Sequence, residues 1–319
     1  MMKIGLDVSG GDFAPDSNIM GAIDALKFLK VAEKIVLIGD QTTILNLLKR
    51  EIVNPELFEI VHAPEIIGMD DRPTKALQNK PNSSISVGFH LLKNKEINAF
   101  ISAGNSGAMS VGAIYNMNTI PGIIRPSIPG YIPNLNGSTT VLIDAGTNPD
   151  AKPEVLYQFG ILGSVFSQFM FNIKNPRVAL LNIGEEEKKG SIAVQQTYQL
   201  MKGTSDFQFI GNVEGRAVFQ SAADVFVCDG FVGNILLKWL ESFHDIFFEK
   251  GVTGSFFERF NFENYGGSPL LGINGNVILG HGISTKLAVC KMIILAQQMI
   301  NAKLLLKIKH ALKNNPTKI

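Results

Sequence analysis

A dense cluster of charge follows the apolar run 178–181 of this chain. The run ends in Asn182-Ile183-Gly184, and three glutamates and two lysines come next, over residues 185–189. Ligands of open α/β sheets bind beyond the carboxyl ends of the strands, so charged groups at this place could transfer protons or hold an anion. The alternative interpretation is a solvated helix start, where the helix dipole favours acidic residues. The candidate site residues of this segment are Asn182, Gly184, Glu185 and Lys188.

Four other apolar, strand-like runs end in the same way, in glycine and small polar residues. Their candidate site residues are, in chain order, Asp7, Gly10 and Gly11; Ser102, Gly104, Asn105, Ser106 and Gly107; Asp144 and Asn148; and Asp229, Gly230, Gly233 and Asn234. The carboxyl ends of parallel strands lie at one edge of a sheet. We therefore expect the five strand ends to line a single polar crevice along one edge of one sheet.

The segment 102–107 is the candidate anion site. It follows a strand-like run and opens a helical pattern, and its glycines would let the backbone approach a ligand closely. A helix start offers free N–H groups and the positive end of the dipole, so phosphate is the natural guest. It is not a Walker A loop, because no Gly-Lys-Ser/Thr follows. A plain strand-to-helix turn that needs glycine for tight packing is the alternative.

Two further side chains could act on a reacting group. Lys238 follows the segment 229–234 and could neutralise an oxyanion, although a helix lysine usually faces solvent. His281 lies between Gly280 and Gly282 and is the one of the five histidines in a site-like setting. No Ser-His-Asp or Cys-His arrangement can be recognised, which argues against an acyl-enzyme.

Alternating strand-like and helical runs position these residues. This alternation predicts an α/β fold with a doubly wound, mainly parallel sheet and helices on both faces. We predict one catalytic domain over 1–319, with a functional excursion over 119–138. The predicted strands are 3–8, 34–39, 98–103, 139–144, 177–183 and 224–228. The predicted helices are 17–30, 42–50, 83–93, 105–118, 152–172, 190–202 and 231–249.

The segment 235–262 is crowded with phenylalanine and leucine and contains the single tryptophan, Trp239. Helical spacing predicts a hairpin of two amphipathic helices, broken near 251–254. Packing in the core or in a dimer interface is the favoured interpretation. Contact with a membrane surface or with an acyl chain is the alternative.

Composition excludes several classes of protein. The chain has 29 basic and 28 acidic residues and a net charge of +1, so no global field would draw it to nucleic acid. Cys228 and Cys290 have neither disulfide nor zinc spacing, and we expect no metal. The start of the chain lacks a leader pattern and no run reaches the ~18 apolar residues of a spanning helix, so we expect a cytoplasmic protein.

Taken in order, the segments resemble the phosphate acyltransferase family over nearly the whole chain. The motifs that carry the resemblance are 7–15, 102–107, 125–126, 158–159, 163–164, 182–190, 229–234, 264–267 and 280–282. The family is similar in fold to the isocitrate and isopropylmalate dehydrogenases and to the phosphotransacetylases. Ser9 and Gln78 depart from the family pattern, and the latter puts one anion contact in doubt.

The resemblance implies transfer of a fatty acyl group from an acyl carrier protein thioester to inorganic phosphate, which gives an acyl phosphate for phospholipid synthesis. It implies a homodimer, possible peripheral contact with the inner face of the membrane, and no bound cofactor, since phosphopantetheine arrives on the carrier protein. We expect residues 104–107 and Lys238 to hold phosphate and the oxyanion. Asn182, Asn234 and Asp229 would position the thioester, and His281 or Glu185 would transfer protons.

Two alternatives stay open. A phosphotransacetylase-like enzyme would use acyl-coenzyme A instead of the carrier protein thioester. An inactive scaffold would bind membranes through the segment 235–262 without turnover.

Overall fold

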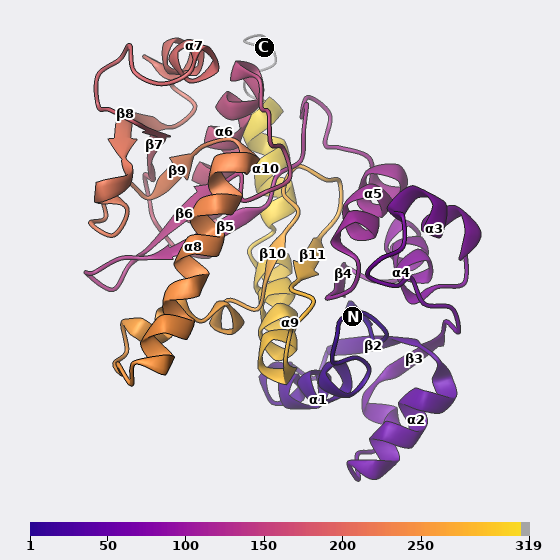
Figure 1. The fold of residues 1–319 in the computed structure, drawn as a ribbon. Coiled ribbons are helices and arrows are strands. Elements are labelled where there is room, and N and C mark those ends of the chain that lie inside the picture. Colours follow the sequence, from indigo (N-terminus) through magenta and orange to yellow (C-terminus); the bar gives the residue numbers. More distant parts are fainter. Residues whose placement is uncertain (314–319) are drawn as a thin grey trace. The chain divides into compact units, whose positions relative to one another are not determined.

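The computed structural model describes residues 1–313, which form two compact units (Figure 1). The first unit comprises residues 1–118 and 262–301, and the second comprises residues 119–261 and 302–313. Each unit has its own β-sheet with helices packed on it. The α/β class predicted from the sequence is therefore confirmed. That the whole chain acts as a single catalytic domain stays a prediction.

The first unit has a six-stranded sheet with the strand order β10-β11-β4-β1-β2-β3. All neighbouring strands in it are parallel except β10 and β11. Its strands are β1 (Met2–Asp7), β2 (Glu33–Gly39), β3 (Glu59–His62), β4 (Ala99–Ser102), β10 (Gly267–Pro269) and β11 (Val277–Gly280). Its α-helices are α1 (Asp16–Ala25), α2 (Gln41–Arg50), α3 (Pro73–Asn79), α4 (Ser84–Lys93), α5 (Ser106–Met117) and α9 (Lys286–Asn301). Short 3₁₀ turns occur at Leu26–Phe28, Pro55–Leu57 and Phe262–Asn264.

The order of these strands places helices on both faces of the sheet. From β1 to β3 the chain moves outward through α1 and α2, and it then returns through α4 to β4 on the other side of β1. Right-handed crossovers in opposite directions put their helices on opposite faces. The packing agrees, since α1 contacts α2 and α9 while α4 contacts α5. The unit is therefore doubly wound, as predicted.

The second unit has a five-stranded sheet with the order β5-β6-β9-β7-β8, in which only the β5–β6 pair is antiparallel. Its strands are β5 (Pro129–Pro133), β6 (Thr139–Ile143), β7 (Arg177–Asn182), β8 (Gln208–Glu214) and β9 (Val225–Val227). Its α-helices are α6 (Pro153–Met170), α7 (Ile192–Met201), α8 (Gly230–Glu249) and α10 (Leu304–Lys313). Short 3₁₀ turns occur at Gly215–Ala217 and Phe257–Phe260.

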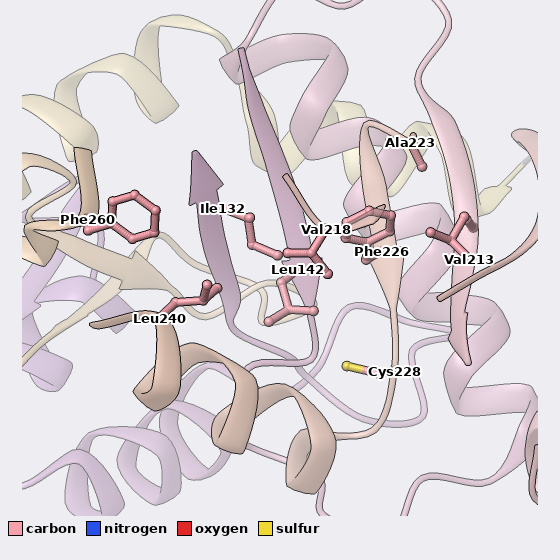
Figure 2. Close-up of a cluster of buried hydrophobic side chains, with 10 residues drawn as sticks. Ile132, Leu142, Val213, Val218, Ala223, Phe226, Cys228, Leu240 and Phe260 are labelled. Carbon is pink, nitrogen blue, oxygen red and sulfur yellow. The ribbon is translucent and has the colours of Figure 1, made fainter. Parts of the chain in front are cut away.

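Helix α8 packs on this second sheet through an apolar cluster (Figure 2). Leu240 of α8 and Phe260 of the following turn meet Ile132, Leu142 and Phe226 from three adjacent strands, and all five side chains are buried. The core interpretation of the phenylalanine-rich segment is correct for this side of the helix. The other side of the helix stays exposed. Its exposed large apolar residues are Phe231, Val232, Ile235, Trp239, Ile246 and Phe248.

The second arm of the predicted hairpin is not a helix. After α8 ends, Gly251 and Gly254 take left-handed backbone conformations, with φ of 64° and 145°. Residues 257–260 then form a single 3₁₀ turn. Phe256 and Phe260 pack with their ring centroids 5.3 Å apart, which holds this turn on the core without a second amphipathic helix.

Among residues 1–313, no single helix is long and apolar enough to cross a membrane; α9 and α10 reach that measure only when taken as one bent pair.

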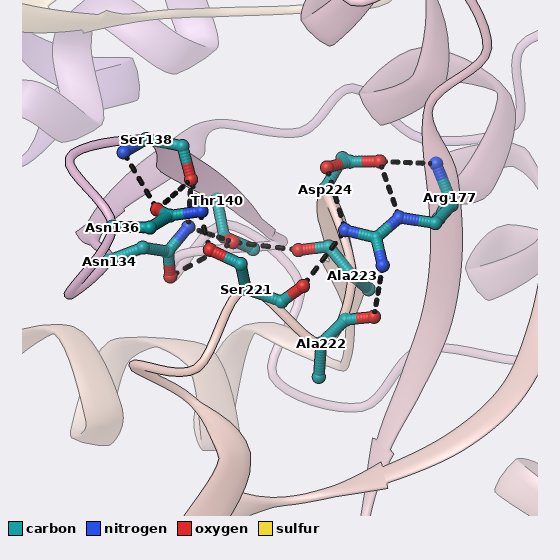
Figure 3. Close-up of polar contacts among 9 residues, drawn as sticks. All are labelled: Asn134, Asn136, Ser138, Thr140, Arg177, Ser221, Ala222, Ala223 and Asp224. Carbon is teal, nitrogen blue, oxygen red and sulfur yellow. Dashed lines mark hydrogen bonds and ion pairs between the residues drawn. The ribbon is translucent and has the colours of Figure 1, made fainter.

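A polar network ties the start of β7 to the loop before β9 (Figure 3). The Arg177 guanidinium donates to both carboxylate oxygens of Asp224, at 3.1 and 3.2 Å. It also donates to the carbonyl oxygens of Ser221 and Ala222, at 2.8 and 3.1 Å. One planar group therefore satisfies four acceptors at the amino ends of β7 and β9, which a lysine ammonium cannot match in geometry.

We expect Arg177→Lys to lower the free energy of unfolding of the second unit by about 1–2 kcal/mol, since the charge is kept but hydrogen bonds to Asp224 and to the carbonyls are lost. Urea unfolding followed by the fluorescence of Trp239 measures it, because Trp239 lies in α8 of the same unit. Arg216→Lys is the matched control, because its side chain is 75% exposed and surface ion pairs contribute little. Equal losses in both variants would contradict the role of the Arg177 fork.

Candidate active-site loops

The five strand ends identified in the sequence divide between the two sheets. Those after β1 and β4 belong to the first unit, and those after β6, β7 and β9 belong to the second. The prediction that all five line one edge of one sheet is therefore wrong. The physical reason is that β5 pairs antiparallel with β6 and begins a separate sheet after α5.

In the first unit, Asp7 is a buried acceptor of hydrogen bonds. Its side chain is 1% exposed and accepts from the Ser102 hydroxyl at 2.6 Å and from the Ser9 N–H at 2.9 Å. Burial raises the pKa of Asp7 above its ordinary value. Hydrogen bonds from Ser102, from Ser84 and from the backbone of Ser9 and Gly10 act in the opposite direction by favouring the carboxylate. In this conformation Asp7 has no surface to offer a substrate.

The loops after β1 and β4 touch through two glycines. A Cβ on Gly10 would lie 2.6 Å from the Gly104 nitrogen and 2.4 Å from an Asp7 carboxylate oxygen, so glycine is required there. The Asn18 side-chain amide of α1 stabilises the loop after β1 by donating to the carbonyls of Val8 and Gly10, at 2.9 and 2.8 Å. These contacts bring Asp7, Gly10, Ser102 and Gly104 together, as expected from their places at two strand ends.

Asn105 joins the candidate anion loop to a third segment, 68–71. Its side-chain oxygen accepts the Ala108 N–H at 2.9 Å and so caps α5. Its amide group donates to the carbonyls of Gly68, Met69 and Asp71, each at 3.0 Å. The side chain is 6% exposed and all its polar atoms are used inside the protein. The structure therefore gives Asn105 an anchoring position.

The amino end of α5 keeps free backbone donors. The first helical N–H groups have no partner within a helix, and the Asn105 cap takes that of Ala108. Among the hydrogen bonds of residues 1–313, none uses the N–H of Ser106 or Gly107. Ser106 is exposed, and the Pro73 ring lies beside Gly107, where a Cβ would be 2.6 Å from it. Arg72, whose backbone lies between Asp71 and Pro73, is therefore next to this helix end. Two free amides and an exposed hydroxyl can bind a phosphate group, and Arg72 places a cationic side chain on the neighbouring segment.

The loop carrying His281 meets the loop after β1. The Gly282 carbonyl accepts the Asp12 N–H at 2.8 Å, and Gly11, with φ of 104°, packs against the same carbonyl. The His281 ring lies on Phe262, with centroids 5.1 Å apart, and is half-buried. His281 thus lies at the carboxyl end of β11, next to β4 in the sheet. Its role in proton transfer stays a prediction.

In the second unit, Asp144 is fully buried and accepts hydrogen bonds from two loops. One oxygen accepts from the Ser127 hydroxyl and the Ile128 N–H, at 3.1 and 3.2 Å. The other accepts from Thr147 N–H and from both the backbone and the side-chain N–H of Asn148, at 3.0, 2.6 and 2.9 Å. Five donors around one carboxylate leave it no free lone pair for a substrate. Asp144 and Asn148 thus shape the turn after β6.

Helix α8 starts in direct contact with that turn. The Gly230 N–H donates to the Asn148 carbonyl at 2.7 Å, and the Asp229 carboxylate caps α8 by accepting the Val232 N–H at 2.8 Å. Gly233 packs so closely that a Cβ there would lie 1.8 Å from the Asp144 carbonyl oxygen. The Asn234 amide donates to the Ala145 carbonyl at 3.3 Å. These residues are brought together as predicted, and their hydrogen bonds fix the start of the helix.

The loop after β7 folds back on Asn182. The Asn182 amide donates to the Lys189 carbonyl at 3.1 Å and its oxygen accepts the Ile183 N–H at 2.8 Å. Helix α7 begins only at Ile192, capped by Ser191, so the charged run 185–189 is a loop and not the helix start of the alternative interpretation. β7 and β6 both border β9, which puts Asn182 about 10 Å from the turn after β6.

The charged side chains of this region are largely exposed and paired with one another. Glu185 lies 3.7 Å from Arg216, and both side chains are more than two-thirds exposed. Hydrogen bonds from Gln199 and Lys202 lower the pKa of Glu187, which makes it a weaker base than a free glutamate. Lys188 is exposed. Lys238 lies more than two turns into α8 and pairs with Glu241 at 2.7 Å. The roles of Glu185, Lys188 and Lys238 stay predictions.

Sequence reasoning missed the residues that support these loops from outside their motifs. Asn18, Ser84, Asp71, Lys80 and Ser127 belong to this group. Lys80 donates to the Asp71 carboxylate at 2.5 Å and to the Ile66 carbonyl at 2.9 Å, which shapes the segment that Asn105 anchors. The sequence signal was weak, since such residues also serve as ordinary helix caps and surface pairs.

Comparison with known sequences gives one consistent family. The profile described as "Fatty acid synthesis protein" matches residues 2–307. A phosphate acyltransferase of Dictyoglomus turgidum is 39% identical, with 98% of each chain covered. A phosphate acyltransferase of Salinibacter ruber is 40% identical, with 91% of this chain and 92% of that protein covered.

Comparison with solved structures supports the fold. A phosphotransacetylase from Streptococcus pyogenes has a TM-score of 0.63 at 20% identity, with 94% of each chain covered. A branched-chain phosphotransacylase from Enterococcus faecalis has a TM-score of 0.64 at 13% identity, with 94% of this chain and 99% of that chain covered. The predicted similarity in fold to phosphotransacetylases is confirmed.

Proposed function

Because the chain belongs to the fatty acid synthesis protein family and is an enzyme that transfers acyl groups to phosphate, we propose that its acyl donor is the thioester of an acyl carrier protein. The observation that carries this proposal is the match to phosphate acyltransferases at about 39% identity over nearly the full length. The product, an acyl phosphate, would supply phospholipid synthesis.

The proposed reaction needs no nucleophile from the protein. An oxygen of phosphate attacks the thioester carbonyl carbon, a C–O bond forms, the C–S bond breaks, and the leaving thiolate takes up a proton. Binding both reactants in one orientation supplies much of the acceleration. Fixed N–H donors and cations stabilise the oxyanion that develops. His281 or Glu185 is the proposed proton carrier.

We propose the amino end of α5 as the phosphate site. The support is the pair of free amides of Ser106 and Gly107, the exposed Ser106 hydroxyl and Arg72 on the neighbouring segment. Lys238, Asn182, Asp229 and Asn234 remain the proposed groups of the second unit. Asp229 would act indirectly, because its carboxylate caps α8.

The remaining proposals concern partners and place. We propose a cytoplasmic enzyme. The exposed apolar residues along α8 support either a homodimer interface or contact with the inner face of the membrane. The net charge of +1 supports the absence of a nucleic acid partner. We expect no resident cofactor, since phosphopantetheine would arrive on the carrier protein.

We expect the purified protein to release thiol from palmitoyl-acyl carrier protein at least about tenfold faster with 10 mM phosphate than without it, because phosphate is the attacking nucleophile. Thiol is followed by a colour reagent, and acyl phosphate is trapped as hydroxamate in equal amount. Sulfate at the same ionic strength is the control, since it resembles phosphate in shape but forms no acyl product.

The same assay separates the two alternatives. Faster turnover of short acyl-coenzyme A than of the carrier protein thioester would support the phosphotransacetylase-like enzyme. Folded protein without phosphate-dependent turnover on either donor, but bound to liposomes, would support the scaffold.

A further inference from the structure

We propose that Asp7 and Ser102 act as positioning residues for the candidate phosphate loop, and that neither contacts a substrate. The proposal rests on the proposed function, because it assigns the phosphate site to the loop that these two side chains hold. It revises our expectation from sequence, which placed both residues among the substrate-binding groups.

A continuous chain of hydrogen bonds runs from Asp7 to the loop. The Asp7 carboxylate accepts the Ser102 hydroxyl proton at 2.6 Å, which turns an oxygen lone pair of Ser102 toward its other partner. That partner is the Gly104 N–H, which donates to the Ser102 oxygen at 2.9 Å. Gly104 lies two residues before Ser106, the first residue of α5. The carboxylate therefore sets the direction of the backbone just before the free amides.

The burial of Asp7 and Ser102 argues that they position the loop and do not bind phosphate directly. Asp7 and Ser102 are each 1% exposed, and Gly104 and the Gly10 loop cover them. A Cβ on Gly104 would lie 3.1 Å from Gly10 Cα and 3.1 Å from the Ser102 oxygen, so no space for a ligand remains between the loops. A carboxylate in direct contact with phosphate would also repel it. Hydrogen bonding through Ser102 avoids that contact, because the hydroxyl lies between the charge and the loop.

Ser84 offers a matched control for Ser102. It is a serine at the start of α4, is 2% exposed, and its hydroxyl also stabilises the Asp7 carboxylate. Unlike Ser102, it has no hydrogen bond to Gly104 among those of residues 1–313. Ser84→Ala and Ser102→Ala therefore each remove one hydroxyl from the same buried carboxylate, and Ser102→Ala alone disconnects the loop.

The test compares phosphate affinity in the variants. We expect Ser102→Ala to raise KM for phosphate about 5- to 10-fold with kcat changed less than twofold, because binding is weakened before and during the reaction alike. We expect Ser84→Ala to leave KM for phosphate within twofold of wild type. The effects of Asp7→Asn and Ser102→Ala on KM should combine less than additively, since the Asp7–Ser102 hydrogen bond is common to both.

Direct binding keeps the inference testable without turnover. The rise in unfolding temperature on adding 10 mM phosphate measures affinity, and we expect Ser102→Ala to lose most of this rise while Ser84→Ala keeps it. Equal behaviour of the two serine variants, in KM and in this rise, overturns the inference while the proposed function stands. If the wild-type protein binds phosphate but does not turn over the thioester, the proposed donor is wrong. The inference is then decided by the rise in unfolding temperature of Ser102→Ala compared with that of Ser84→Ala. No rise in the wild type overturns the inference as well.

Discussion

Replacing Gly233 by alanine is expected to destabilise the second unit by at least about 3 kcal/mol, or to prevent its folding. Glycine to alanine inside a helix normally stabilises it by roughly 1 kcal/mol, so the expected sign is reversed. The new Cβ would lie 1.8 Å from the Asp144 carbonyl oxygen and 3.1 Å from the Cys228 sulfur. The carbonyl belongs to a residue held by five hydrogen bonds, so it cannot move aside without breaking them.

Gly215→Ala provides the comparison for this change. Gly215 lies in the same unit, and nothing lies within 4 Å of the Cβ that it would gain. Urea unfolding followed by Trp239 fluorescence reports both variants. If Gly233→Ala unfolds at the same urea concentration as Gly215→Ala, then the close approach of α8 to the turn after β6 is not a feature of the folded protein.

Asn105→Ala is expected to reduce turnover at low phosphate concentration about 100-fold, equivalent to roughly 2.7 kcal/mol of transition-state stabilisation. The Asn105 side chain caps α5 and also anchors the segment 68–71 through three carbonyls. Its loss would let that segment and Arg72 move away from the helix end. Loss of the cap alone should lower the free energy of unfolding by about 1 kcal/mol. The loss of stability measured by thermal unfolding should therefore be smaller, in free energy, than the loss of transition-state stabilisation measured by the turnover assay.

Asn116→Ala tests whether the effect is specific to the helix end. Asn116 lies in the same helix and donates to the Gly112 carbonyl at 2.8 Å, far from the loop. We expect its turnover to match wild type and its stability to change by no more than about 0.5 kcal/mol. Unchanged turnover in Asn105→Ala would remove this residue from the proposed mechanism and leave it a structural cap.

The sequence by itself determined the local elements and the chemistry available at their ends. Predicted helices at 83–93 and 105–118 correspond to α4 (Ser84–Lys93) and α5 (Ser106–Met117). Their caps, Ser83 and Asn105, are also local features, because each bonds to an N–H only three residues away. The strands after which the glycine loops follow were found in the same way, since apolar runs that end in glycine are a local signal. The family resemblance came from those same loops in their order along the chain.

Only the tertiary structure decided which of these residues meet and which are buried. Ser102 and Asp7 are 95 positions apart, and nothing local shows that a hydroxyl of one strand end is bonded to a carboxylate of another. Periodicity also cannot tell one sheet from two, because strand order depends on pairing between distant segments. The prediction of a helical second arm for the hairpin was wrong for a related reason. Its phenylalanines have helical spacing, but the core offers them contacts that a single 3₁₀ turn satisfies. Asp7 and Asp144, both candidate site residues from the sequence, are buried in the structure and bonded to the loops around them.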